Sequence, residues 1–132
     1  MTRYAIDAAA LLHIVTDELA VDPAHQLVAP NAIRTHALTL LLQAVARGEL
    51  AERDARRLHT RLTELKIRVL SDRVSRWTSF QLAREHGWDT TYDAEYLAVA
   101  RLQADAFVTV DPDMAARAEG VVPLAPLAAL GE

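Results

Sequence analysis

Short apolar runs alternate along the chain with longer segments in which apolar residues recur every three or four positions. Compact runs rich in β-branched and aromatic residues are typical of strands, and the three- and four-residue spacing is typical of helices. The predicted strands are 4–6, 27–29, 66–70, 106–110 and, at one edge, 121–122. The predicted helices are 8–15, 30–47, 51–65, 74–83, 91–103 and a short one opening at Asp111-Pro112.

This alternation predicts a parallel sheet, because parallel neighbours need crossover connections and these are usually helical. Helical positions far outnumber strand positions, so the sheet should be small. The predicted fold class is therefore α/β, a three-layer, Rossmann-like sandwich with helices on both faces of the sheet. Residues 1–132 are expected to form a single domain, since the length is near that of one domain and no repeat or linker is visible.

The composition restricts the chemistry and the location. Cysteine is absent, which excludes disulfides, cysteine-rich zinc sites and thiol nucleophiles, so a bound metal would need oxygen or imidazole ligands. No apolar run reaches the roughly 18 residues of a membrane span, and Asp7 interrupts the segment where a secretory leader would be apolar. We therefore expect a cytoplasmic protein with no membrane partner.

The charge balance restricts contacts with nucleic acid. The chain carries 14 basic and 18 acidic residues, a net charge of −4. A protein that holds nucleic acid by bulk charge is expected to be basic, so any such contact must be local. All the cations but Lys66 are arginines, which suit bidentate phosphate contacts, although a GC-rich gene also explains the excess. Arg3, Arg34 and Arg84 are candidate phosphate contacts.

Two aspartates directly follow predicted strands, Asp7 after 4–6 and Asp111 after 106–110. Ligands of open α/β sheets bind beyond the carboxyl ends of the strands, where the strand order reverses. Asp93, near the start of a predicted helix, is placed to face the same crevice. Three neighbouring carboxylates repel one another unless a cation lies between them, and such oxygen ligands suit Mg²⁺ or Mn²⁺. The spacing predicts a divalent metal site.

Helix capping is the alternative role of these aspartates. Asp7 and Asp111 can each cap the helix that follows, the latter with Pro112 at the first helical position. Thr90 to Asp93 also matches the capping-box pattern. For any one acid at a helix start, capping is the more common role, and spacing alone does not separate the two roles.

Four segments of the chain together resemble the PIN domain of VapC toxins, the metal-dependent ribonucleases of bacterial toxin–antitoxin pairs. They are YAIDA at 4–8, AP at 29–30, TYDAEYLAVA at 91–100 and VTVD at 108–111. The last two in this order are specific, and the resemblance covers essentially the whole chain. It implies that Asp7 and Asp93 ligate the metal, that Asp111 binds it directly or through water, and that Thr109 hydrogen-bonds an acid or a metal-bound water.

The resemblance also implies an activity and partners. The activity is metal-dependent hydrolysis of a phosphodiester in a single-stranded loop of a folded RNA, with Asp7, Asp93 and Asp111 as the catalytic residues. The partners are a second copy in a homodimer and a small antitoxin that covers the active-site groove. Trp77, Phe80 and Trp88 are candidates for a partner surface, although the few aromatic residues of such a chain are more often in the core.

One position departs from the family pattern. PIN domains usually carry a glutamate on the second helix, about six residues after the Ala-Pro pair, and His36 stands there in this chain. Imidazole removes a negative charge and suits Mn²⁺ or Zn²⁺ better than Mg²⁺. His36 has four open roles: a metal ligand, a donor to Asp7 or Asp93, a general base, or the mark of a degenerate PIN-like protein that binds RNA or a partner without cleaving. Glu95 should point away from Asp93 and is a poor substitute.

Overall fold

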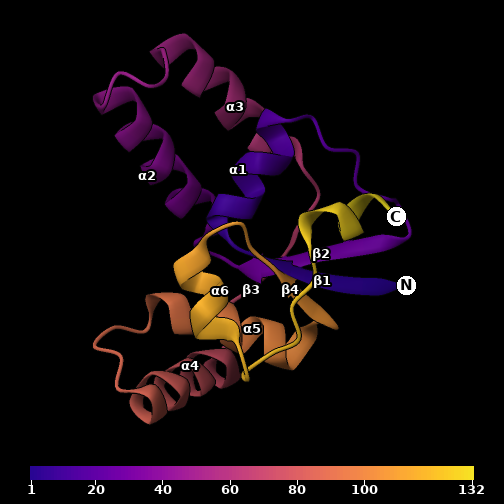
Figure 1. Ribbon diagram of the computed structural model, residues 1–132, viewed down its shortest axis with the longest axis vertical. Coiled ribbons are helices and arrows are strands. Elements are labelled where there is room, and N and C mark those ends of the chain that lie inside the picture. Colours follow the sequence, from indigo (N-terminus) through magenta and orange to yellow (C-terminus); the bar gives the residue numbers. More distant parts are fainter.

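The computed structural model describes residues 1–132 and contains a four-stranded parallel sheet with helices on both sides (Figure 1). The strands are β1 Thr2–Ile6, β2 His25–Pro30, β3 Arg68–Leu70 and β4 Ala106–Val108. The helices are α1 Ala8–Thr16, α2 Ile33–Ala46, α3 Glu52–Glu64, α4 Arg73–His86, α5 Tyr92–Gln103 and α6 Pro112–Ala118, with a final 3-10 helix η1 Leu127–Gly131. The predicted α/β fold with a small parallel sheet is confirmed.

The strand order is β3-β2-β1-β4, and every neighbouring pair is parallel. The chain progresses from β1 through β2 to β3 on one side, and β4 then returns to the other side of β1. The order therefore reverses between β1 and β4. In register, Ala5 lies opposite Val28 on one side and Phe107 on the other. The residues that leave the carboxyl ends of β1 and β4 consequently emerge side by side, at the place where such sheets bind ligands.

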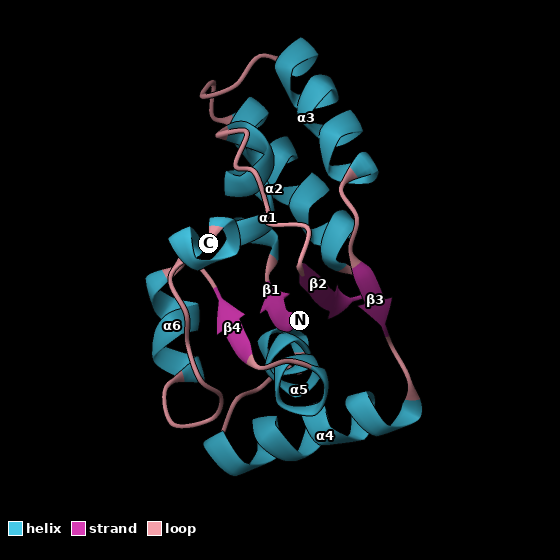
Figure 2. Ribbon diagram, turned by 90° about the vertical axis from the view of Figure 1, so that its right-hand side faces the viewer, coloured by secondary structure: helices cyan, strands magenta, loops and turns pink.

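Helices form a layer on each side of the sheet (Figure 2). On one side α5 packs against β1, β2 and β4, and α4 packs against α5, whereas α1, α2 and α3 pack against one another on the other side. Because α5 lies between the sheet and α4, the run Tyr96–Ala100 is buried without interruption. One hydrophobic core unites 29 buried residues. None of the helices combines the length and the apolar character needed to cross a membrane.

The segment around Pro30 differs from the sequence prediction. We expected Pro30 in the first turn of the second helix, but it is the last residue of β2 and pairs with Leu70 of β3, and α2 begins at Ile33. A proline lacks an amide proton, so it suits a strand end as well as a helix start. Local sequence does not separate these two positions.

The edge of the sheet beside β4 also differs. The predicted strand 121–122 does not form, and a single bridge joins Phe107 to Leu124 instead. Pro123 has no amide proton to donate, which limits pairing along this segment. The predicted strand 106–110 ends at Val108. Its last two positions leave the sheet, and the side chain of Thr109 turns to Asp7.

Candidate active site

Asp7 is the best-held side chain at the carboxyl edge of the sheet. It leaves β1 directly and is only 4% exposed. Its Oδ1 accepts a hydrogen bond from the amide of Ala10 at 2.8 Å, which caps α1, and its Oδ2 accepts a short one from the hydroxyl of Thr109. The predicted capping role of Asp7 is confirmed. The contact with Thr109 also fixes the carboxylate against the segment that follows β4.

The surroundings of Asp7 disfavour its negative charge. Burial raises the pKa of Asp7 most, the hydrogen bonds from Thr109 and Ala10 oppose that shift, and the charge of Asp111 raises the pKa further. No lysine, arginine or histidine forms an ion pair with Asp7. A desolvated carboxylate beside a second carboxylate is the arrangement that a bound cation relieves.

Asp111 lies beyond the end of β4 on the other side of Thr109. Its Oδ1 accepts from the amide of Asp113 at 2.9 Å and caps α6, with Pro112 at the first helical position, as predicted. Its own amide donates to the hydroxyl oxygen of Thr109 at 3.1 Å. Thr109 therefore links the two aspartates, because its hydroxyl donates to one and accepts from the backbone of the other.

Asp93 has a different partner. It lies in the first turn of α5, and its Oδ2 is 3.1 Å from Nη1 of Arg117 on α6, in a pair of side chains that are each about two-fifths exposed. The guanidinium of Arg117 also lies 5.0 Å from the centroid of the Trp88 ring. The predicted capping box of Thr90 and Asp93 is wrong, because the N-cap of α5 is Thr91, one residue later, and its side chain makes no capping hydrogen bond.

His36 takes part in a contact that the sequence did not reveal. Its Nδ1 lies 2.6 Å from the hydroxyl oxygen of Tyr96, and it makes no hydrogen bond to Asp7 or Asp93. Burial raises the pKa of Tyr96 well above its usual range, and the charges of Asp7, Glu95 and Asp93 add to the shift. The phenol therefore keeps its proton at neutral pH and lies close to the acids. Tyr96 is three residues after Asp93, and this shared helix face was the available signal.

The other candidates fall in different places. Arg34 donates from Nε and Nη2 to the carbonyls of Leu62 and Leu65, which ties α2 to the end of α3 and gives this guanidinium a structural role. Arg3 is at the amino end of β1, away from Asp7. Arg84 is exposed on α4. Glu95 accepts a hydrogen bond from Ser71 at 3.3 Å, away from Asp93 as predicted.

The aspartates are ligands of the type that a hard divalent cation prefers, but fewer than three of them lie close together. No three or more His, Asp or Glu side chains come close enough together to hold a metal ion. Asp7 and Asp111 supply two carboxylates, each with lone pairs beyond those used in capping. Mg²⁺ is commonly held by one or two carboxylates, with water and substrate phosphate completing its coordination. The third acid, Asp93, is held by Arg117 in an exposed pair of the kind that contributes little stability.

Comparison with known proteins bears on the fold. No family model and no curated protein matches the chain. Among solved structures, the chain is similar to the crystal structure of PAE2754 from Pyrobaculum aerophilum, with a TM-score of 0.73 and 24% sequence identity over 98% of this chain and 92% of that one. At this level of identity the likeness shows a shared fold and carries no statement about activity.

The ion pair between Asp93 and Arg117 leads to a testable expectation. Arg117→Gln should change the free energy of unfolding by about 1 kcal/mol or less, because the pair is exposed. On the sequence-based expectation of a divalent metal site at this edge, the same change should tighten Mn²⁺ binding, because it frees Asp93 to join the other acids. Urea denaturation and isothermal titration calorimetry measure the two effects. Arg57→Gln, which breaks an exposed pair with Asp54 on α3, is the control; equal Mn²⁺ affinity in both variants would contradict the expectation.

Proposed function

We propose that the protein is a divalent-metal-dependent endoribonuclease of the PIN type. The observation that carries the proposal is the buried carboxylate of Asp7, held by Thr109 and facing the charge of Asp111. This pair stands where the strand order of a parallel sheet reverses, between β1 and β4. A buried acid beside another acid, without a cationic side chain, is costly to keep unless the site works with a bound cation.

Each residue of the proposed site has a separate role. Asp7 and Asp111 would hold Mg²⁺ or Mn²⁺, with Asp93 joining them after release from Arg117. When bound, the cation supplies positive charge for the phosphoryl oxygens and lowers the pKa of a bound water. Thr109 fixes the orientation of Asp7, and the amide of Ala10 fixes its other oxygen. Tyr96 keeps its proton close to these acids, and its hydroxyl is held by His36.

His36 is the residue that sets this site apart. It removes a carboxylate from the position where PIN domains usually have one, and we propose that Mn²⁺ supports the reaction better than Mg²⁺ for this reason. Its contact with Tyr96 favours an indirect role, in which His36 positions the phenol. His36 is thus a positioning residue in this proposal.

The biological setting of the proposal follows from the resemblance to VapC toxins. The protein would act in the cytoplasm as the toxin of a bacterial toxin–antitoxin pair, in the form of a homodimer. Its substrate would be a folded RNA cut at a single-stranded loop, and a small antitoxin would cover the site. A short reading frame directly upstream of the gene would support this setting.

The activity is tested with purified protein and a panel of labelled RNA hairpins in Mn²⁺, Mg²⁺ or EDTA. We expect cleavage within the loops, faster with Mn²⁺ than with Mg²⁺, and none in EDTA. Asp111→Asn should reduce the rate at least about tenfold, because it removes one ligand charge. Asp113→Asn changes an exposed acid in the same turn and should leave the rate unchanged. Cleavage that survives EDTA, or an equal loss in both variants, would refute the assignment.

A second candidate is a PIN-like protein that binds RNA or a partner without cleaving it. Two contacts favour it: Asp93 is paired with Arg117, and His36 replaces an acid and is bonded to Tyr96. This candidate predicts no cleavage with any divalent ion, together with RNA binding that survives EDTA. The hairpin panel therefore separates the two functions.

A further inference from the structure

One face of α4 carries an unusual stripe of side chains. Arg73, Trp77, Phe80 and Arg84 follow one another at spacings of four, three and four residues, so they lie along the same side of the helix. The opposite side, which packs on α5, buries Ser75, Ser79, Leu82 and Ala83. We refer to the first four residues as the α4 stripe, and it faces away from the core.

The centre of the α4 stripe is an exposed aromatic stack. Trp77 is 58% exposed and Phe80 is 47% exposed, which agrees with the partner-surface alternative for these two residues and not with the more common core position. Their rings are nearly parallel, with centroids 4.6 Å apart and an angle of 9° between the planes. Large exposed apolar groups gathered in one place mark interaction sites more often than isolated ones do. Both rings therefore keep a large part of their surface exposed to solvent.

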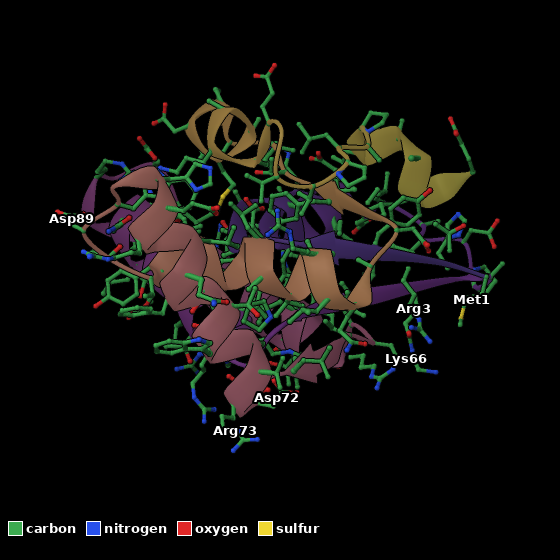
Figure 3. All side chains as sticks on the ribbon, turned by 90° about the horizontal axis from the view of Figure 1, so that it is seen from below. Met1, Arg3, Lys66, Asp72, Arg73 and Asp89 are labelled. Atoms are coloured by element: carbon green, nitrogen blue, oxygen red, sulfur yellow. The ribbon has the colours of Figure 1, made fainter.

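The two ends of the α4 stripe are cationic. Arg73 and Arg84 are exposed, and neither forms an ion pair with a carboxylate. Arg73 projects from the N-terminal end of α4, and Asp89 marks the loop beyond its other end (Figure 3). In a chain of net charge −4, this is a local positive feature of the kind that nucleic-acid contact requires.

A hollow adjoins the α4 stripe and extends to the start of α5. It has a volume of about 410 Å³, and its lining includes Phe80 and Arg84 of the stripe together with Trp88, Asp89 and Tyr92. Tyr92 is 68% exposed, and the next residue in the chain is Asp93. Trp88 lies under Arg117, the ion-pair partner of Asp93. The aromatic surface thus runs from α4 to the start of α5, beside the candidate site.

We propose that the α4 stripe and the adjoining hollow bind a single-stranded segment of RNA. Bases stack on exposed aromatic rings whatever their sequence, and arginines at intervals pair with the phosphates between them. An unpaired strand exposes both its bases and its phosphates, whereas a duplex hides the base faces. That this strand is the substrate rests on the proposed nuclease function, but the binding itself does not need catalysis.

A second copy of the chain fits the α4 stripe less well. Two copies related by a two-fold axis would pair this helix antiparallel with itself, because such an interface uses the same surface twice. Arg73 of one copy would then approach Arg84 of the other. This juxtaposition of like charges disfavours the stripe as a self-association surface, while phosphate groups complement both ends.

The test measures binding in EDTA, so that catalysis plays no part. Fluorescence anisotropy follows a labelled 12-nucleotide oligoadenylate, with a blunt RNA duplex of the same length as comparison. We expect the single strand to bind more tightly than the duplex. Trp77→Ala and Phe80→Ala should each weaken binding about tenfold. Arg73→Gln and Arg84→Gln should each reduce the slope of log affinity against log salt concentration by about 0.7.

Matched controls lie at the other end of the molecule. Leu42→Ala removes an exposed apolar side chain on α2, and Arg56→Gln removes an exposed arginine on α3 that has no ion pair. Neither should alter RNA binding, and circular dichroism verifies the fold of every variant. Unchanged affinity in the stripe variants, or an affinity loss of the same size in the controls, would overturn the proposal.

Sedimentation velocity and cleavage assays distinguish the remaining outcomes. Dissociation of a dimer by Trp77→Ala with RNA affinity unchanged would make the stripe a self-association surface and overturn the proposal. Asp7→Asn should keep the affinity for the oligonucleotide while losing cleavage. If the stripe variants bind normally but wild-type protein cleaves RNA, this inference fails and the nuclease stands. If they bind weakly and wild type cleaves nothing, the nuclease fails and the RNA surface stands.

Discussion

Asp7→Asn is expected to reduce RNA cleavage by about a hundredfold or more and, in the absence of metal, to raise the melting temperature. The first effect follows because asparagine removes the charge of the best-held candidate ligand. The second follows because burial and the charge of Asp111 raise the pKa of Asp7, so the ionised carboxylate destabilises the fold. Asparagine keeps an oxygen for the amide of Ala10 and is an equally good N-cap.

The pH dependence of stability gives the sign of this effect. The pKa of Asp7 in the folded protein lies above the value of 3.8 from which it is shifted, so the folded state binds more protons between these two values. The stability that Asp7 contributes is complete at low pH and is lost as the pH rises through its folded pKa. The difference in stability between wild type and Asp7→Asn, measured in EDTA, should therefore become less favourable to wild type with rising pH.

Asp72 supplies the matched control, because it also caps a helix. Its hydrogen bonds with Ser75 lower the pKa of Asp72. Its contribution is therefore present at neutral pH and is lost as the pH falls through its folded pKa. Thermal unfolding of wild type, Asp7→Asn and Asp72→Asn across a pH series should give differences of opposite slope. A slope of the same sign for both variants, or a lower melting temperature for Asp7→Asn at pH 7, would contradict the assignment.

If replacing Asp7 raises the melting temperature as expected, the residue is kept at a cost in stability. Such a cost is the usual sign of a functional residue. Thr109 illustrates this, because its hydroxyl holds a carboxylate that would be easier to bury as a neutral group. The Arg117 pair with Asp93 offsets part of the negative charge of the same edge in the metal-free protein.

The sequence located Asp7 and Asp111 correctly at one edge, because parallel strands joined by helices must end on the same side of a sheet. It also marked both as helix caps, and the structure combines the two roles rather than choosing between them. The capping prediction for Thr90 and Asp93 was wrong because α5 begins one residue later, with Thr91 as its N-cap. The prediction of a strand at 121–122 was wrong because an edge strand forms only where it can pair with a neighbouring strand. The local sequence pattern carries no information about that neighbour.

The side-chain contacts of His36 and Asp93 could not be predicted from the sequence. His36 and Tyr96 are 60 residues apart, and their approach depends on how α2 and α5 meet over the end of the sheet. Arg117 reaches Asp93 because α6 follows β4 back across the start of α5, and no spacing rule indicates that pair. The sequence left open whether Trp77 and Phe80 are exposed or in the core, because it does not show which face of their helix packs on α5.

His36→Glu is expected to increase Mg²⁺-dependent cleavage about tenfold and to shift the preference from Mn²⁺ toward Mg²⁺. The change places a carboxylate beside Tyr96, whose phenol lies within the influence of the charges of Asp7 and Asp93, and Mg²⁺ favours oxygen over nitrogen ligands. In EDTA the variant should melt at a lower temperature than wild type, because it adds a negative charge beside Tyr96, where the charges of Asp7, Glu95 and Asp93 already act.

Added Mg²⁺ should reverse that loss of stability, since an ion that binds only the folded state stabilises it by about 2.7 kcal/mol at a concentration of 100 times its dissociation constant. His36→Gln is the control, because it is neutral and can still bond to the hydroxyl of Tyr96. Calorimetric titration with Mg²⁺, melting curves with and without the ion, and cleavage rates are compared among the three proteins. If the glutamate variant neither binds Mg²⁺ more tightly nor regains stability from it, position 36 does not face the ion. That result would contradict the proposal that His36 causes the preference for Mn²⁺.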